Sequence, residues 1–144
     1  MTTANKGIDE KLFSYLVNLL GNTPFYKFLG MKIRNIGQGE SELFIDIEPH
    51  HENIIKGVHG GVIMALADAA MATSVRSLGH ETSTVDFTNS FMRPATLDKP
   101  LLSKGRVVKQ GKSLVFTEAV VYSGDKLVAR EHATFFHGPD IELD

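Results

Sequence analysis

The amino-acid sequence predicts an α+β fold in which a curved antiparallel sheet of five to six strands wraps around one long central helix. The helix is predicted over residues 60–78, a segment that is apolar on most sides and therefore has to be largely enclosed. The segments that follow it are joined by short turns, which makes neighbouring strands antiparallel. Wrapping the sheet around the helix is the economical way to bury that helix.

An extra N-terminal helix precedes the predicted sheet. Apolar residues recur at helical spacing over 8–20, and Gly21 supplies a stop signal. Thr23 and Pro24 then resemble an N-cap followed by proline at the first helical position. A second, short helix is therefore expected to reach Gly30.

Six segments read as strands, separated by turn residues such as glycine, proline, serine and aspartate. In the second of them Leu43, Ile45 and Ile47 alternate with acidic residues, so one face should be buried. The predicted strands are 31–36, 40–47, 82–93, 101–110, 113–123 and 126–136.

Length and composition describe one globular domain over 1–144, with a helical extension at 1–29 and a core at 30–137. A net charge of −2 gives no strong field that favours nucleic acid or an anionic membrane. The absence of cysteine excludes a disulfide framework, a thiolate metal site and a cysteine nucleophile. Neither a signal peptide nor a membrane span is predicted, so we expect a soluble, cytoplasmic protein.

The start of the central helix combines groups that suit acyl transfer. Gly60 and Gly61 open the helix, where backbone N–H groups at the positive end of the helix dipole stabilise a developing oxyanion. Asp68 follows among alanine and leucine residues, where an apolar setting raises the basicity of a carboxylate. His59 precedes the glycines and stands about 13 Å from Asp68 along a helix, too far for both to serve one small reacting centre. A second copy of the chain that supplies its own Asp68 resolves this spacing.

Several short motifs occur in a fixed order along the chain: Asn53, Gly57, His59-Gly60-Gly61, Leu66-Ala67-Asp68, Thr84-Val85-Asp86-Phe87, Phe91-Met92-Arg93-Pro94-Ala95, Gln110-Gly111-Lys112 and Leu127-Val128-Ala129. Together they resemble the hotdog-fold acyl-CoA thioesterases of the phenylacetate-degradation (PaaI) type, over about residues 30–136. The resemblance implies the hotdog fold, an acyl-CoA substrate and no cofactor beyond the CoA of that substrate. It also implies a homodimer, often paired into a dimer of dimers, with active sites at the dimer interface.

The resemblance assigns a role to each matching residue. Asp68 is either the general base that activates water or the nucleophile that forms an anhydride, and the sequence does not separate the two. Asn53 orients the water or the carbonyl, and Thr84 assists the carboxylate. His59 fixes the loop or polarises the thioester.

Arg93 and Lys112 are the expected contacts of the CoA phosphates, because relatives place CoA near the matching strand end and hairpin. The adjacent His50 and His51 raise the question of a metal site. Adjacent histidines rarely chelate one ion together, and no obvious spaced carboxylate accompanies them, so no metal is predicted.

Two other functions are compatible with this fold. Hotdog hydratases and dehydratases act on hydroxyacyl or enoyl thioesters, but their carboxylate and histidine are typically spaced differently. A non-catalytic acyl-CoA-binding module would be expected to lack the carboxylate or the asparagine, whereas Asp68 and Asn53 are both present. Thioester hydrolysis is therefore the preferred hypothesis, with the acyl group left open.

Overall fold

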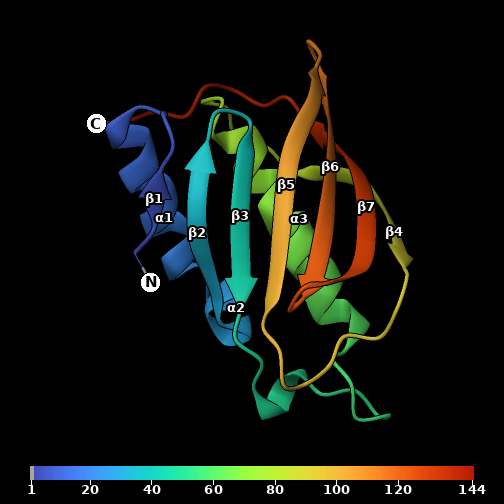
Figure 1. Ribbon diagram of the computed structural model, residues 1–144. Coiled ribbons are helices and arrows are strands. Elements are labelled where there is room, and N and C mark those ends of the chain that lie inside the picture. Colours follow the sequence, from blue (N-terminus) through green and yellow to red (C-terminus); the bar gives the residue numbers. More distant parts are fainter. Residues whose placement is uncertain (1) are drawn as a thin grey trace.

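A seven-stranded sheet wrapped around one long helix forms the centre of the computed structural model, which describes residues 2–144 (Figure 1). The strand order is β1-β2-β3-β5-β6-β7-β4, in which β1 runs parallel to β2 and the other neighbours are antiparallel. The elements are β1 (Ala4–Asn5), α1 (Glu10–Asn22), α2 (Pro24–Leu29), β2 (Met31–Gly37), β3 (Glu40–Ile45), η1 (Pro49–His51), α3 (Gly60–Arg76), β4 (Thr84–Phe91), β5 (Leu101–Gln110), β6 (Leu114–Ser123) and β7 (Lys126–Phe136).

The predicted α+β fold is confirmed, with one strand more than expected. Strands β5 and β7 have the predicted bounds, and the other predicted strands and the central helix differ by one or two residues at their ends. The additional strand is β1, whose two residues pair with the end of β2. A segment of two residues shows no alternation of apolar and polar side chains, so the sequence pattern gave no sign of it.

The two N-terminal helices cover the β2 edge of the sheet (Figure 1). The Asp9 side chain caps α1 by accepting hydrogen bonds from two backbone N–H groups of the first turn. The buried face of α1 consists of leucines at helical spacing, from Leu12 to Leu20. Helix α2 begins at Pro24 and ends at Leu29, and the C-cap residue Gly30 has a φ of 76°, a left-handed conformation that glycine adopts without strain.

Helix α3 is buried along most of its length and lies very close to the sheet. Gly105 of β5 makes this approach possible, because a Cβ atom there would lie 2.8 Å from the carbonyl carbon of Ala70. The Ser41 hydroxyl on β3 donates a hydrogen bond to the carbonyl oxygen of Ala70 at 2.7 Å. Among residues 2–144 no helix is both long and apolar enough to span a lipid bilayer.

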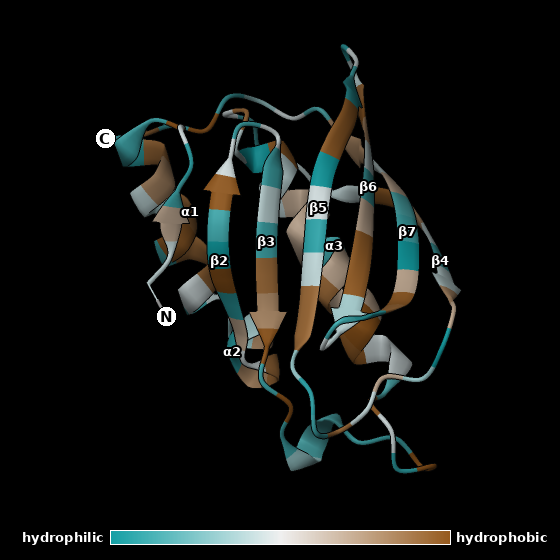
Figure 2. Ribbon diagram, viewed as in Figure 1, coloured by the Kyte–Doolittle hydropathy of each residue, from teal (hydrophilic) through white to brown (hydrophobic). Residues whose placement is uncertain are grey.

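Strand β4 forms one edge of the sheet and pairs only with β7 in the described chain. Its eight residues are mostly exposed, whereas side chains of the interior strands β6 and β7 alternate between buried and more exposed positions. Hydrophilic and hydrophobic residues also follow one another in bands along these interior strands (Figure 2). An edge strand of this length leaves a row of unpaired backbone groups that is able to pair with another strand.

A buried carboxyl group lies directly beside this edge strand. Glu131 of β7 is 1% exposed, and neither of its carboxylate oxygens has a hydrogen-bond partner within residues 2–144. Its cross-strand neighbour is Asn89 of β4, whose side-chain amide also lacks a partner in that range. Burial raises the pKa of Glu131 from 4.5 to about 8.

This shift predicts that the free energy of unfolding falls with rising pH. The unfolded chain releases the Glu131 proton near pH 4.5, whereas the folded chain keeps it until about pH 8, so stability is lost between these values. Glu131→Gln should flatten this slope in denaturant titrations over the same range. The control is Asp125→Asn in the exposed β6–β7 turn, which should keep the slope of the unmodified protein. An unchanged slope in Glu131→Gln would contradict the assignment.

Candidate active site

Asp68 and Thr84 form the first part of the candidate site. Asp68 projects from the middle of α3, and its Oδ1 atom accepts a hydrogen bond from the Thr84 hydroxyl, at the start of β4, at 2.8 Å. Burial raises the pKa of Asp68, and the Thr84 hydrogen bond and the charge of Arg76 lower it by less, so its pKa lies above 3.8. The result is a half-buried carboxylate with increased basicity and one oxygen not engaged by Thr84.

The N-terminus of α3 forms the second part. His59 caps the helix, because its Nδ1 atom accepts a hydrogen bond from the Gly61 N–H at 2.8 Å. The expectation that both glycine amides form the oxyanion hole therefore needs a correction: the Gly61 N–H is already occupied. The Gly60 N–H has no hydrogen-bond acceptor within residues 2–144, so it is the amide that is available to an oxyanion. The His59 side chain thus fixes the start of the helix.

Asn53 holds the turn that precedes this helix. Its Oδ1 atom accepts hydrogen bonds from the N–H groups of Ile55 and Gly57, each at 2.9 Å. Its Nδ2 atom makes one long contact, at 3.4 Å, with the carbonyl oxygen of Val58. The oxygen of Asn53 is therefore committed to the turn, while its amide group retains a hydrogen available to a ligand.

A cleft of about 710 Å³ opens beside Asn53 and Gly60. Arg93 and Phe91 also line it, and the Phe91 ring lies so close to Gly60 that a Cβ atom there would be 2.8 Å from the ring. Lys112 does not belong to this group, because it lies in the β5–β6 turn at the opposite end of the sheet (Figure 1). The expected pairing of Arg93 and Lys112 on one ligand is therefore not formed within a single chain.

Lys112 instead lies at the end of the molecule that holds Thr84. The N–H of Phe136 donates to the carbonyl oxygen of Ser83, and the next residue, His137, donates to the carbonyl oxygen of Ser113. These contacts link the β5–β6 turn to the start of β4. The candidate residues thus fall into two groups at opposite ends of β4: Asp68, Thr84 and Lys112 at its start, and Asn53, Gly60 and Arg93 at its end.

Residues 56–129, more than half of the chain, match the family model described as the Thioesterase superfamily. The chain belongs to this superfamily. A Thermoplasma volcanium protein that carries the name "putative esterase" is 30% identical over 81% of this chain and 88% of its own length. Human acyl-coenzyme A thioesterase 13 is 36% identical over 49% of this chain and 52% of its own length.

A solved structure with the same fold is that of the Escherichia coli PaaI protein, from the phenylacetic acid degradation operon. Its TM-score is 0.86 and its identity 22%, over 93% of this chain and 98% of that chain. The prediction of a hotdog fold is confirmed by this structural match, and the prediction of a thioesterase is confirmed by the superfamily match. The roles of individual residues stay predictions.

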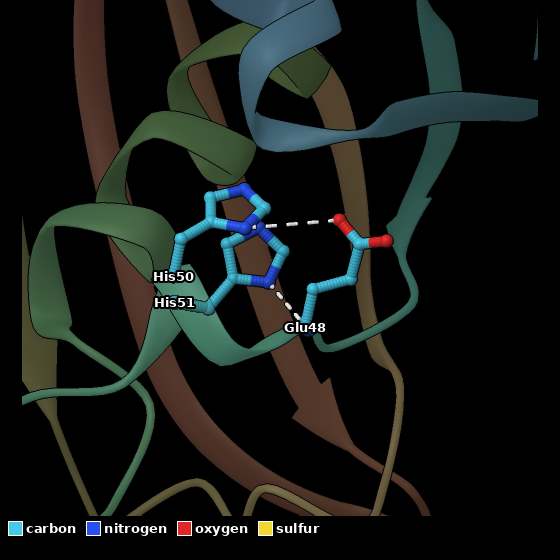
Figure 3. Close-up of side chains that lie close together, drawn as sticks. All are labelled: Glu48, His50 and His51. Atoms are coloured by element: carbon cyan, nitrogen blue, oxygen red, sulfur yellow. Dashed lines mark hydrogen bonds and ion pairs between the residues drawn. The ribbon is translucent and has the colours of Figure 1, made fainter.

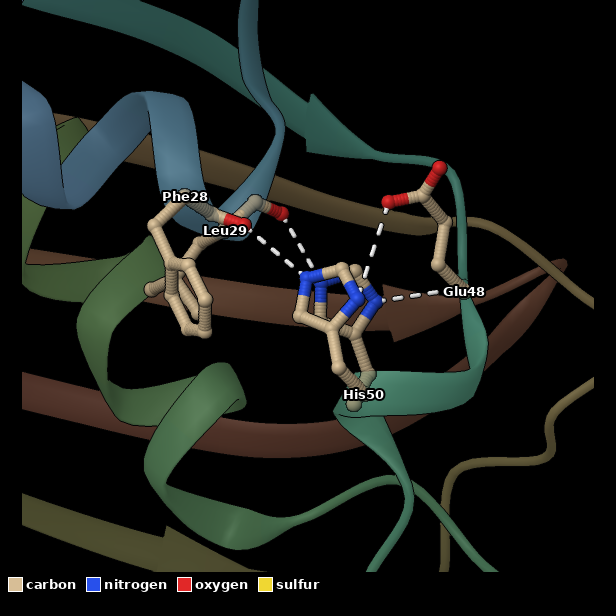
Figure 4. A network of polar contacts seen from close by, with 5 residues as sticks. Phe28, Leu29, Glu48 and His50 are labelled. Atoms are coloured by element: carbon tan, nitrogen blue, oxygen red, sulfur yellow. Dashed lines mark hydrogen bonds and ion pairs between the residues drawn. The ribbon is translucent and has the colours of Figure 1, made fainter.

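Two histidines fasten the N-terminal helices of this thioesterase to the loop that carries the candidate site. The Nε2 atoms of His50 and His51 each lie 2.9 Å from a carbonyl oxygen at the end of α2, those of Phe28 and Leu29 (Figure 4). The Nδ1 atom of His51 accepts a hydrogen bond from the Glu48 N–H at 2.9 Å (Figure 3). We call His50, His51 and Glu48 the histidine clasp.

The clasp is organised for structure, although its ligand atoms lie within 4.8 Å of one another, as in a metal site. Both ring nitrogens of His51 already have backbone partners, which leaves it no lone pair for an ion. The backbone carbonyl of His51 also accepts the N–H of His59 at 2.8 Å. The clasp therefore connects α2 directly to the start of α3, a link that the sequence signalled only as two adjacent histidines.

The clasp predicts a loss of stability in acid. His51 is fully buried, and burial lowers its pKa below 6.5, so the unfolded chain takes up a proton first and the free energy of unfolding falls as pH drops below that value. His51→Ala should cost about 2 kcal/mol at neutral pH through two lost hydrogen bonds, and should weaken the acid dependence. The matched control is His50→Ala, which removes one hydrogen bond of an exposed ring and should cost less. Equal losses in the two variants, measured by chemical denaturation, would contradict this account.

Proposed function

We propose that the protein hydrolyses acyl-CoA thioesters to a carboxylic acid and CoA, at a site shared between two copies of the chain. Membership of the thioesterase superfamily supports the reaction type, and the similarity to acyl-coenzyme A thioesterase 13 supports the substrate class. The observation that carries the shared site is the position of the two residue groups at opposite ends of β4.

A second copy of β4 brings these groups together. Two-fold symmetric pairing of an edge strand with its own copy is antiparallel, so the start of one strand lies opposite the end of the other. When β4 pairs along its whole length, Thr84 of one copy faces Phe91 of the other, with about 5 Å between paired Cα atoms. Asp68 of one copy then lies near Gly60 of the other. Within one chain these two residues are about 12 Å apart along α3.

In the proposed reaction, the thioester carbonyl oxygen accepts a hydrogen bond from the Gly60 N–H at the positive end of the α3 dipole. Negative charge develops on this oxygen during attack, and an oriented amide donor of this kind contributes about 2.7–4 kcal/mol to the barrier reduction. The remaining hydrogen of the Asn53 amide is available to the same oxygen or to the attacking water.

Asp68 from the other copy supplies the base or the nucleophile. As a base it removes a proton from water, which attacks the carbonyl carbon and expels the CoA thiolate. As a nucleophile it attacks the carbonyl carbon and displaces the CoA thiolate to form an anhydride, which water then hydrolyses to release the carboxylic acid and regenerate the Asp68 carboxylate. In both cases Thr84 orients the carboxylate, and the raised pKa of Asp68 increases its basicity. The reaction needs only water as a co-reactant.

The same pairing places Arg93 of one copy on the side of Lys112 of the other. Both side chains are cations that bind phosphate oxygens, and CoA carries its phosphates far from the thioester. The proposal therefore assigns the cleft beside Asn53 and Arg93 to CoA, with the partner's β5–β6 turn completing it.

The proposed role of Asp68 is tested by Asp68→Asn, which keeps the size of the side chain but removes its basicity. Release of free thiol from a panel of acyl-CoAs should fall by about a hundredfold or more in kcat. In the unmodified enzyme, kcat/KM should rise with pH through a pKa above 3.8. Asp46→Asn, an exposed carboxylate at the end of β3, is the matched control and should keep full turnover. Turnover of Asp68→Asn close to that of the unmodified enzyme would overturn the mechanism.

Sharing of the site is tested by mixing two inactive variants, Asp68→Asn and Asn53→Ala. Heterodimers would contain one site with both substitutions and one site with neither, so part of the activity should return on mixing. Formation of heterodimers is followed by mass spectrometry with one variant isotopically labelled. Heterodimers that form but recover no activity would show that each chain carries its own complete site.

A further inference from the structure

A small cavity lies between the N-terminal helices and the C-terminal half of α3. Its volume is about 160 Å³, and its apolar wall is formed by Leu16, Leu19 and Leu20 of α1. Tyr26 of α2 and Arg76 of α3 line it as well. An apolar cavity of roughly 150 Å³ is large enough to hold a benzene molecule, so this one is suited to the end of a small organic group.

Two polar side chains that line the cavity, those of Tyr26 and Arg76, have hydrogen-bond donors available to a ligand. Its two threonines are satisfied, because Thr23 donates to the carbonyl oxygen of Leu19 and Thr73 to that of Ala69. The Tyr26 hydroxyl has no hydrogen bond within residues 2–144, and the buried Nε of Arg76 has none there either. Arg76 makes one hydrogen bond, from a terminal nitrogen to the carbonyl oxygen of Thr82 at 3.0 Å, and no ion pair within the same range.

The candidate catalytic carboxylate, Asp68, is not part of the cavity wall but lies on α3, the helix that contributes Thr73 and Arg76 to it. Arg76 follows Asp68 by two turns on the same face of α3, about 12 Å along the helix. The charges of Asp68 and Arg76 both act on Tyr26. Burial and the charge of Asp68 raise the pKa of Tyr26, and the charge of Arg76 lowers it. The Arg76 guanidinium group thus lines the cavity without an ion pair within residues 2–144, and Asp68 acts electrostatically on Tyr26, another residue of the cavity wall.

We propose that this cavity binds the far end of the acyl group and selects acyl groups that end in a carboxylate, which the side chains of Arg76 and Tyr26 bind. This specificity rests on the thioester hydrolysis proposed above. A carboxylate is the partner that a partly buried guanidinium lacks here, and hydrogen bonds between charged groups are stronger than neutral ones. The leucines of α1 enclose the apolar part of the chain.

The cavity wall comes largely from outside the segment that defines the superfamily. The family model begins at residue 56, whereas the leucines and Tyr26 belong to α1 and α2. The N-terminal extension thereby gains a function in addition to covering the β2 edge. Selection by this cavity would depend both on the N-terminal helices and on Arg76, which lies within the matched segment.

The test compares hexanoyl-CoA with adipoyl-CoA, which has the same number of carbon atoms and a terminal carboxylate in place of a methyl group. Hydrolysis is measured as kcat/KM, and binding by calorimetry with the non-hydrolysable thioether analogues of both compounds. The unmodified protein should prefer the adipoyl compound about tenfold or more in both measurements. Arg76→Met should abolish the preference, and Tyr26→Phe should reduce it. The readout is the ratio of the two kcat/KM values, or of the two affinities. An effect of Arg76 on the charge of Asp68 alters the hydrolysis of both compounds and therefore cancels in this ratio.

A pair of tryptophan variants on α1 tests the location. Leu19→Trp fills the cavity and should weaken binding of both six-carbon analogues while leaving the acetyl analogue unchanged. Ser14→Trp, at an exposed position of the same helix, should alter none of them. Absence of a preference in the unmodified protein, or a preference that survives Arg76→Met, would overturn the inference. Preferential binding without hydrolysis of any acyl-CoA would support the cavity and reject the proposed reaction.

Discussion

The close contact between α3 and the sheet is the constraint on which the rest of the structure depends. Gly105 and Ser41 meet the backbone of Ala70 directly, so a side chain larger than hydrogen on β5 would push the helix away. Protein interiors are packed as densely as organic crystals, and a helix held in this way has one position along the sheet. That position determines where the two ends of α3 emerge, and with them Gly60 at one end and Arg76 at the other.

The fixed position of α3 also keeps the Asp68 carboxylate away from the Gly60 amide of the same chain. The Asp68 carboxylate in the middle of α3 and the Gly60 amide at its start are about 12 Å apart along the helix, so they cannot approach one another within one straight helix. The edge strand β4 runs from the group that contains Asp68 to the group that contains Gly60, and its outer backbone groups, unpaired within residues 2–144, are free to pair with a second chain. In the proposed reaction, assembly of two chains is a condition of catalysis rather than an addition to it.

Much of the fold could be predicted from the sequence, because long periodic segments such as 101–110 and 126–136 carry their structure in their own residues. The motif order also predicted Asp68 and the glycine pair as site residues, and their roles stay predictions. A local sequence pattern does not show which distant residue each polar group will contact in the folded chain. The capture of the Gly61 amide by His59, the burial of Glu131 beside Asn89 and the contacts of the histidine clasp all depend on tertiary neighbours.

Helix α2 is only six residues long, yet one end meets the histidine clasp and its Tyr26 side chain lines the cavity together with Arg76 of α3. It therefore acts as a short strut between the loop that leads to Asn53 and the cavity proposed to bind the acyl group. A shift of this strut would move the Asn53 turn and the proposed acyl cavity together. Substitutions that alter the turn and substitutions that alter the cavity should therefore occur together in related sequences. Homologous enzymes that lack a comparable N-terminal segment would have to stabilise that turn by other contacts and would be free to accept other acyl groups.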